Sequence, residues 1–487
     1  MFPHRGNRFL ERPEGVFIIP ETDTKNECMR SQVKWDRIYP GGEHKKTILE
    51  YRSPDWFWLA LQNEATLLTE KTTVQLSNIA ISEELLFVLI RKTNVRVGEE
   101  FSIFEHAVNG DCIKDTPRDG VGKPSKYTLS LDGDGENETV SSRTLENIRR
   151  IPQNSIECCF REVVIKNTVL ISIVPKLKLR EGSVLEEIRL AANERKYIEP
   201  TQEQMFCVGR IKRIVLIDYA VDILPRLEIQ KDNVLEELVL DAKKDEHVAQ
   251  EQRICVRRIK KIVLVDCAVN ILLRLEIQKG SVLEELVLAA KKDEHVAQEQ
   301  RICVKRIKKI VLIDYAVAVV LRLEIQEGSV LEELTLTAKK EEHAVLAQEQ
   351  VVCVRRIKKI TLRDYAVAVI FNLGLQEDGE LEELTLAAWL SQIVAPILAQ
   401  KRMLCIGRIK KIVLKDHAIN ILPNLNIRKH GELRWLELHA MGIENFAHLL
   451  NVGDRSIDVW DVKTAVYGRH QHEILSKLNG TNTKMFS

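Results

Sequence analysis

The sequence has few aromatic residues, no excess of charge and no long apolar run. Phe, Trp and Tyr make up 5% of the 487 residues, and 72 basic side chains balance 71 acidic ones for a formal net charge of +1. Proteins that bind nucleic acids usually carry a clear basic excess, which is missing here. A membrane-spanning helix needs a run of about 18 apolar residues, and the chain contains none. We therefore expect no nucleic-acid partner and no membrane span.

Cysteines and targeting signals are equally scarce. The 10 cysteines are too few in so long a chain to indicate a disulfide framework. The segment that begins at Met1 contains no apolar stretch of the kind found in signal peptides. These observations predict a cytoplasmic protein with reduced thiols.

The local motifs of common enzymes are also missing. The sequence has no phosphate-binding Gly-rich loop, no H-E-x-x-H zinc motif, no G-x-S-x-G nucleophile motif and no dinucleotide fingerprint. We therefore predict that the protein is not an enzyme and that it uses no cofactor and no metal.

What the sequence does contain is an internal repeat with a usual length of 24 residues. Residues 259–264 (IKKIVL) represent one type of repeat start, and residues 283–288 (LEELVL) represent a second type that alternates with it. A short strand cannot bury its apolar face alone, but stacked copies share one core. Clear repeats start at residues 211, 235, 259, 283, 307, 331, 357, 381, 409 and 433, and weaker ones start near 160 and 185.

This pattern resembles the leucine-rich-repeat family, whose repeat opens with L-x-x-L-x-L and often has Asn or Cys at the ninth position. The resemblance implies an α/β leucine-rich-repeat solenoid, or horseshoe, with a parallel β-sheet on its concave face. We predict this solenoid over residues 160–440, degenerate repeats over 71–159, and a C-terminal cap and tail over 441–487. Residues 1–70 are either an N-terminal cap or a docking segment for a partner.

The ninth position departs from the family pattern, so the sequence does not explain how the turn after each strand is held. The residues at this position are Tyr219, Lys243, Cys267, Lys291, Tyr315, Lys339, Tyr365, Trp389 and His417.

The third and fifth positions of each repeat are predicted to face solvent on the concave side, with the eighth beside them. Basic and acidic residues alternate at the third position, Val and Thr dominate the fifth, and Asp alternates with Ala at the eighth. Opposite charges on neighbouring strands stabilise a sheet, so the charges either determine which repeats stack or form a recognition surface, and both roles are compatible. The predicted protein-binding residues are those at the third position: Arg213, Glu237, Lys261, Glu285, Lys309, Glu333, Lys359, Glu383, Lys411 and Trp435.

Trp435 interrupts this charged row. Aromatic residues are common anchors in protein interfaces, which favours a role for Trp435 in binding. The alternative is that the C-terminal tail covers it, through Val459 or Trp460 in a last strand near residues 456–460.

A longer repeat provides a second candidate contact. The step from residue 381 to residue 409 is 28 residues, and its insert is apolar where sister repeats are charged. Exposed apolar patches usually mark contact sites, so we predict a contact patch containing Trp389, Ile393 and Leu398. The alternative is that the insert folds over the repeats and buries its own side chains.

Recurring cysteines and histidines are predicted to be structural or solvent-exposed. The cysteines precede alternate strands, and positions two strands apart are separated by about 10 Å, too far for a disulfide or a shared zinc ion. They are predicted to be free, buried thiols: Cys207, Cys255, Cys303, Cys353 and Cys405. His247, His295 and His343 recur in a charged segment and are predicted to be exposed.

The function predicted from these features is that of a non-catalytic scaffold that binds a partner protein through its concave face. One alternative is a regulator of an enzyme, such as a GTPase-activating protein or a ubiquitin-ligase adaptor. Another is a structural protein that self-associates, because the repeats starting at 235 and 283 are nearly identical.

Overall fold

The computed structural model divides the chain into two compact units, Met1–Leu235 and Glu236–Ser487. It describes residues 2–4, 7–13, 15–20, 46–50, 66–105, 112–114, 128–132, 142–180, 183–198, 206–229, 233–244, 254–256, 258–277, 282–292, 302–304, 306–325, 331–345, 352–353, 357–371, 373–374, 380–399, 403, 408–425, 433–459, 462–468, 470–479 and 483–486.

The N-terminal part of the first unit contains three sheets. One is antiparallel, with strand order β1 (Phe2–His4), β2 (Asn7–Arg12), β3 (Gly15–Pro20) and β5 (Thr66–Leu68). The second is parallel, with order β4 (Lys46–Glu50), β6 (Thr73–Ser77) and β8 (Asn94–Val97). The third has order β10 (Ile113–Lys114), β7 (Ile79–Ser82), β9 (Phe101–Phe104), β12 (Ile156–Cys158) and β14 (Leu177–Leu179).

Helices α2 (Glu83–Lys92) and α4 (Ser142–Arg150) pack beside these sheets. The Ser82 side chain caps α2 by accepting a hydrogen bond from the Leu85 backbone N–H, which satisfies one of the free donors at a helix start. Asn147 of α4 is buried, and its amide group contacts the backbone of Ile90, Thr93 and Val95. It therefore ties α4 to the end of α2 and the start of β8.

The C-terminal part of the first unit is a parallel sheet whose strands belong to successive repeats. Its order is β11 (Thr128–Asp132), β13 (Glu162–Lys166), β15 (Leu185–Ala192) and β17 (Ile211–Asp218). The 3-10 helices η3 (Val169–Lys176) and η6 (Tyr219–Arg226) follow β13 and β17. Within the segment predicted to contain degenerate repeats, residues 71–159, β11 belongs to this sheet, whereas β6 and β8 belong to a separate sheet.

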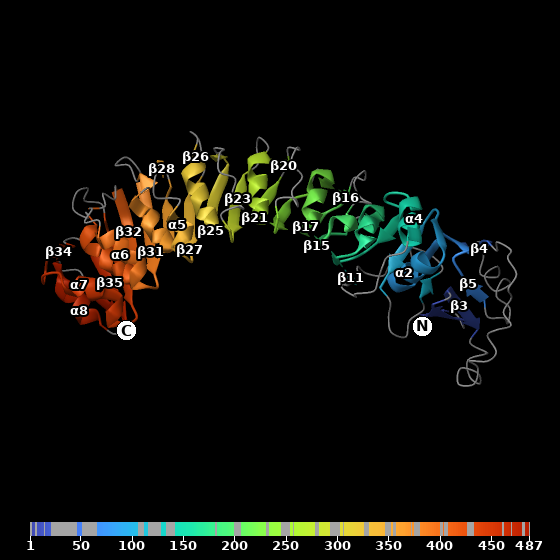
Figure 1. Ribbon diagram of the computed structural model, residues 1–487, viewed down its shortest axis with the longest axis horizontal. Coiled ribbons are helices and arrows are strands. Elements are labelled where there is room, and N and C mark those ends of the chain that lie inside the picture. Colours follow the sequence, from blue (N-terminus) through green and yellow to red (C-terminus); the bar gives the residue numbers. More distant parts are fainter. Residues whose placement is uncertain are drawn as a thin grey trace. The chain divides into compact units, whose positions relative to one another are not determined.

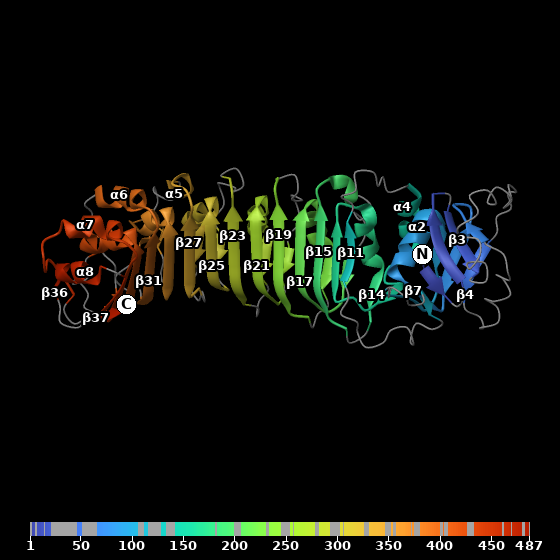
Figure 2. The same cartoon turned by 90° about the horizontal axis from the view of Figure 1, so that it is seen from below.

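The second unit continues the repeat as a parallel sheet with a usual strand spacing of 24 residues (Figure 2). Strands β19 (Leu235–Ala242) to β37 follow the chain from one edge to the other. Their order continues with β21 (Ile259–Asp266), β23 (Leu283–Ala290), β25 (Ile307–Asp314), β27 (Glu333–Ala338), β29 (Lys359–Asp364), β31 (Glu380–Ala388), β32 (Arg408–Asp416), β33 (Trp435–Ala440), β35 (Lys463–Gly468) and β37 (Thr483–Phe486).

The sheet extends past the predicted boundary at residue 440, since β35 and β37 pair with it in parallel. A strand forms within the predicted segment 456–460, but it is not the last strand of the chain and does not join the main sheet. Residues Ile457–Asp458 form β34, which pairs with β36 (Leu478–Asn479) outside the main sheet.

The connections of the second unit lie on one side of its sheet (Figure 1). After each strand with the IKKIVL-type start comes a 3-10 helix: η8 (Cys267–Arg274), η10 (Tyr315–Arg322), η11 (Tyr365–Phe371) or η12 (His417–Asn424). After strands with the other start come α5 (Glu342–Val345), α6 (Ser391–Ala399), or η13 (Ile443–Phe446) with α7 (Ala447–Leu450). Helix α8 (Gln471–Lys477) follows β35.

Short parallel strand pairs complete these connections. They are β16 (Phe206–Val208) with β18 (Leu227–Ile229) in the first unit, and β20 (Ile254–Val256) with β22 (Leu275–Ile277), β24 (Ile302–Val304) with β26 (Leu323–Ile325), and β28 (Val352–Cys353) with β30 (Leu373–Gly374) in the second.

From the third position onward, burial in several strands of the main sheet alternates with the period of two that strand geometry imposes. In β21 and β23 the first, fourth, sixth and eighth positions are buried, and the third, fifth and seventh are half-exposed. The prediction that the eighth position lies beside the third and fifth is therefore wrong. Even positions from the fourth onward share the core face, so Asp266 and Ala290 point into the interior with the leucines.

Candidate interaction surface

Positions are counted from the first residue of each repeat. We call the third, fifth and seventh positions, which lie on the main-sheet strands, the open face. All ten residues predicted from the third position lie there, and each is half-exposed. Arg213 belongs to the first unit, and the other nine belong to the second. Because the strands pair with equivalent positions in register, third-position residues such as Lys261, Glu285 and Lys309 are direct neighbours.

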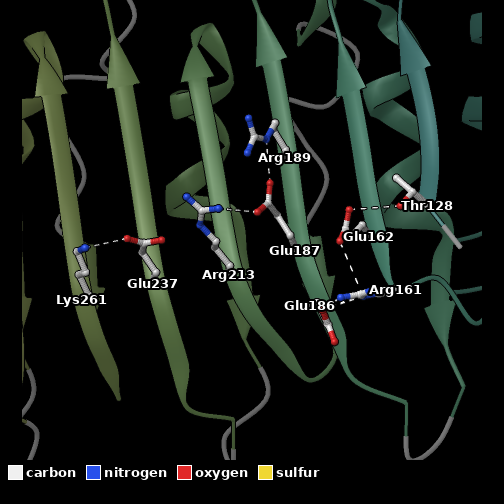
Figure 3. Close-up of polar contacts among 9 residues, drawn as sticks. All are labelled: Thr128, Arg161, Glu162, Glu186, Glu187, Arg189, Arg213, Glu237 and Lys261. Atoms are coloured by element: carbon white, nitrogen blue, oxygen red, sulfur yellow. Dashed lines mark hydrogen bonds and ion pairs between the residues drawn. The ribbon is translucent and has the colours of Figure 1, made fainter. Parts of the chain in front are cut away.

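The third-position charges form ion pairs along this row. In the second unit, Lys261 Nζ lies 3.3 Å from a carboxylate oxygen of Glu237 (Figure 3). It also lies 3.3 Å from a carboxylate oxygen of Glu285. Lys309 Nζ in turn lies 3.2 Å from Glu285 and 3.6 Å from Glu333. Each of these lysines therefore bridges two neighbouring strands.

Similar ion pairs occur elsewhere on the open face of each unit. Within the first unit, Arg213 Nη1 donates to Glu187 Oε2 at 2.8 Å, and Arg189 Nε donates to Glu187 Oε1 at 2.8 Å (Figure 3). Within the second, Lys411 Nζ lies 3.1 Å from Glu437 and 3.9 Å from Glu383.

The pKa values of the row reflect this pairing. Partial burial by itself would raise the pKa of Glu285, but contacts with Lys309 and Lys261 outweigh it and lower that pKa. Burial would likewise lower the pKa of Lys261, yet its two glutamates raise it. The row is thus largely neutralised by its own members, which favours the structural role for most of these charges.

An aliphatic stripe runs beside the charged row in the middle of the second unit. It consists of fifth- and seventh-position side chains on three consecutive strands, all half-exposed. The members of this stripe are Val263, Val265, Val287, Ala289, Val311 and Ile313. Side chains on the other face of the same strands are covered by the 3-10 helices and their neighbours.

The open face becomes basic toward the C-terminal strands. Arg363 and Lys415 occupy the seventh positions of β29 and β32, where β21 to β27 have uncharged residues. Both are exposed, and neither forms an ion pair with a residue in the described part of the chain. Ala387 of β31 lies between them in register.

Trp435 lies within the sheet and not at its end. It pairs with Lys411 on one side and Lys463 on the other, and its Nε1–H donates to Glu437 Oε1 at 2.8 Å. Val459, proposed as its cover, is buried beside β34, and Trp460 lies outside the described residues. Trp435 is half-exposed, which keeps it accessible to a partner.

The apolar insert is only partly a surface feature. It folds as α6, in which Ile393 is 3% exposed and Leu398 is half-buried. The prediction that Ile393 is an exposed contact is wrong, because the helix turns this side chain toward the repeats. Trp389 and Leu390 precede the helix and are exposed.

Aspartates at the eighth position support the turn after the strand, a role that the sequence pattern did not reveal. Asp218, Asp266, Asp314, Asp364 and Asp416 all have a positive φ close to 55°. Asn167 occupies the same position in β13's repeat, with φ 48°, and its Oδ1 accepts a hydrogen bond from the Asn193 backbone N–H. Asp and Asn tolerate this conformation better than other side chains with a Cβ.

The recurring cysteines and histidines have different outcomes. The side chains of Cys207, Cys255, Cys303, Cys353 and Cys405 lie outside the described part of the structure, as do His247 and His295. His343 is described, and the prediction of exposure is wrong for it. It is 4% exposed, and its Nδ1 lies 3.2 Å from Asp314 Oδ1. Its ring contacts that of Tyr315, with the centroids 4.3 Å apart and the ring planes tilted by 53°.

Within the described residues, no group of three or more His, Cys, Asp or Glu side chains is placed to hold a metal ion. No helix among these residues is long and apolar enough to cross a membrane. No protein-family model matches the chain, and comparisons with curated proteins and with solved structures give no significant match.

Proposed function

We propose that the chain is a leucine-rich-repeat solenoid and that its open face binds a partner protein. The repeat length, the parallel strands in register and the buried apolar positions support the fold part of this proposal. The eighth-position Asp and Asn residues support it too, because they supply acceptors at the strand ends, one position before the Asn or Cys of the family pattern.

The aliphatic stripe is the observation that carries the function. Large contiguous apolar surfaces on soluble proteins usually mark interaction sites. The stripe is flanked by ion pairs that are already satisfied, so a partner can cover it without leaving a buried charge unpaired. This arrangement matches a protein interface with an apolar centre and a polar rim.

The test begins with a photo-crosslinking amino acid in place of Val287, which identifies the protein that contacts the stripe. The affinity of that purified protein is then measured for the full chain and for the variant Val287→Asp. A charge in a desolvated contact should weaken binding at least about tenfold.

Val282→Asp is the matched control, since Val282 is exposed just before the same strand but outside the open face. It should bind like the parent chain. Equal affinity of Val287→Asp and the parent chain would overturn the proposal.

A partner that is itself an enzyme would make this chain its regulator, and a second copy would make it a self-associating protein. Both alternatives use the same stripe, and the identity of the cross-linked protein distinguishes them.

A further inference from the structure

Exposed apolar side chains gather at the carboxyl ends of β31 and β33. Trp389 is 70% exposed and Leu390 51%, and they directly follow β31. Met441 is 79% exposed and Ile443 45%, and they follow β33. We call these four residues the apolar edge. Single exposed apolar residues are common on protein surfaces, but here four lie at the ends of two strands that both flank β32.

Two residues of the apolar edge stand where related repeats have lysine. Trp389 and Met441 occupy the ninth position of their repeats, and the preceding repeats of the same type have Lys243, Lys291 and Lys339 there. The two strands are separated by two strand spacings, about 10 Å. The side chains of a Trp and a Met at this separation are long enough to border a single contact.

Two unpaired cations of the open face lie nearby. Arg363 and Lys415 are at the seventh position, two residues or about 7 Å along a strand from the ninth. They too are two strands apart, and the small side chain of Ala387 lies between them. Lys261, Lys309, Lys359 and Lys411 at the third position, by contrast, are paired with glutamates.

We infer that the apolar edge and this cation pair form one docking site for an acidic, apolar segment of a partner protein. The inference rests on the proposed function and deepens it, since it names the chemistry of the segment. Two carboxylates would pair with Arg363 and Lys415, and a large apolar side chain would cover Trp389 or Met441.

The separation of the cations specifies the segment further. In an extended chain the side chains of residues i and i+2, or i and i+4, share a face and lie about 7 or 13 Å apart, so acidic residues at one of these two spacings fit the cation pair best. An anionic membrane is a poorer match, because lipid recognition typically uses clusters of about four to eight basic residues. Here two cations in the described part of the open face are exposed and unpaired at this edge.

The test uses a random dodecapeptide library displayed on phage and selected against the full chain. The expected consensus contains two acidic residues two or four positions apart next to a large apolar residue. The affinity of an enriched peptide is then measured by fluorescence anisotropy. It should fall about tenfold or more in the double variant Arg363→Glu with Lys415→Glu, and similarly in Trp389→Ser with Met441→Ser.

Lys260→Glu with Lys308→Glu is the matched control, because these lysines are also exposed and also lie two strands apart. This pair should leave the affinity unchanged. Failure to enrich acidic peptides, or an equal loss in the control variant, would overturn the inference.

Two further measurements distinguish other occupants. Sedimentation with phosphatidylcholine vesicles containing phosphatidylserine tests for a membrane, and sedimentation velocity tests for a second copy of the chain. Vesicle binding or self-association that is lost in Trp389→Ser with Met441→Ser would also overturn the inference.

Failure of this inference is separable from failure of the proposed function. If the cross-linked partner loses affinity for Val287→Asp but not for the variants of the apolar edge and the cation pair, the open face binds a partner and only the docking site is wrong.

Discussion

The Oδ1 atom of Asp266 accepts a hydrogen bond from the backbone N–H of Lys291, which follows the neighbouring strand, at 3.0 Å. Asp314 does the same for the backbone N–H of Lys339 at 3.2 Å. Each aspartate thus satisfies a donor at the end of the next strand, where the sheet's own hydrogen bonds stop. Free backbone donors at such ends are costly when water is excluded.

Asp364 provides the first prediction, because its carboxylate accepts a hydrogen bond from the Trp389 backbone and its φ is 54°. Asp364→Ala should lower the free energy of unfolding by about 1–3 kcal/mol, since it removes the acceptor and places Ala in the left-handed region. Asp364→Asn keeps both the acceptor and the tolerance for this conformation, as Asn167 does in β13's repeat. Urea denaturation measures the two variants, and equal losses would contradict the assigned role.

The pH dependence of Asp364→Asn provides a second prediction. Burial raises the pKa of Asp364 in the folded protein, although the Trp389 N–H and Arg363 act in the opposite direction. An acid with a raised folded pKa contributes its full stability below its unfolded pKa and loses it as pH rises through the folded pKa. The Asn variant cannot ionise, so its stability relative to the parent chain should improve between about pH 4 and pH 7. Thermal unfolding across this range tests it, and a relative decline would contradict the sign.

Lys309 provides a third prediction, since it bridges Glu285 and Glu333. Lys309→Glu would place three like charges in register and should cost about 1–3 kcal/mol of unfolding free energy. Lys463→Glu is the control, because Lys463 is exposed and its register neighbour is Trp435 instead of a glutamate, and this variant should stay within about 0.5 kcal/mol. High salt should narrow the difference between the two variants, because surface charges are screened. If the two variants have the same unfolding free energy at low salt, the charged row does not stabilise the sheet.

The fourth prediction compares Ile393, which is buried in the insert, with Trp389, which is exposed at its start. Ile393→Asp should destabilise the second unit by about 3 kcal/mol or more, since it buries an unpaired charge. Trp389→Ser should change stability by no more than about 0.5 kcal/mol, because its side chain is exposed. Denaturant titration compares the two, and a large loss for Trp389→Ser would place it in the core instead of the docking site.

The repeat, its parallel strands and the pairing of charges were readable from the sequence. The spacing of the repeats and the alternation of apolar and polar residues predict these features. A strand with apolar residues at its fourth and sixth positions buries the face that carries them. Equal spacing then puts Lys261 beside Glu285 wherever the strands stack. The weaker strand β35 was missed, because Thr464 and Val466 alternate over too short a distance to stand out from an ordinary tail.

The roles of individual polar and apolar residues were decided by the tertiary structure. Asp266 and Ala290 both occupy the eighth position of their repeats. The sequence does not show that the Asp266 carboxylate accepts a hydrogen bond from the backbone that follows the neighbouring strand. His343 is buried because Asp314 and Tyr315 of another repeat enclose it. Ile393 and Trp389 belong to the same apolar run, and only the direction in which α6 packs separates a core side chain from a surface one. These contacts join residues of different strands and helices, and no local pattern in the sequence predicts them.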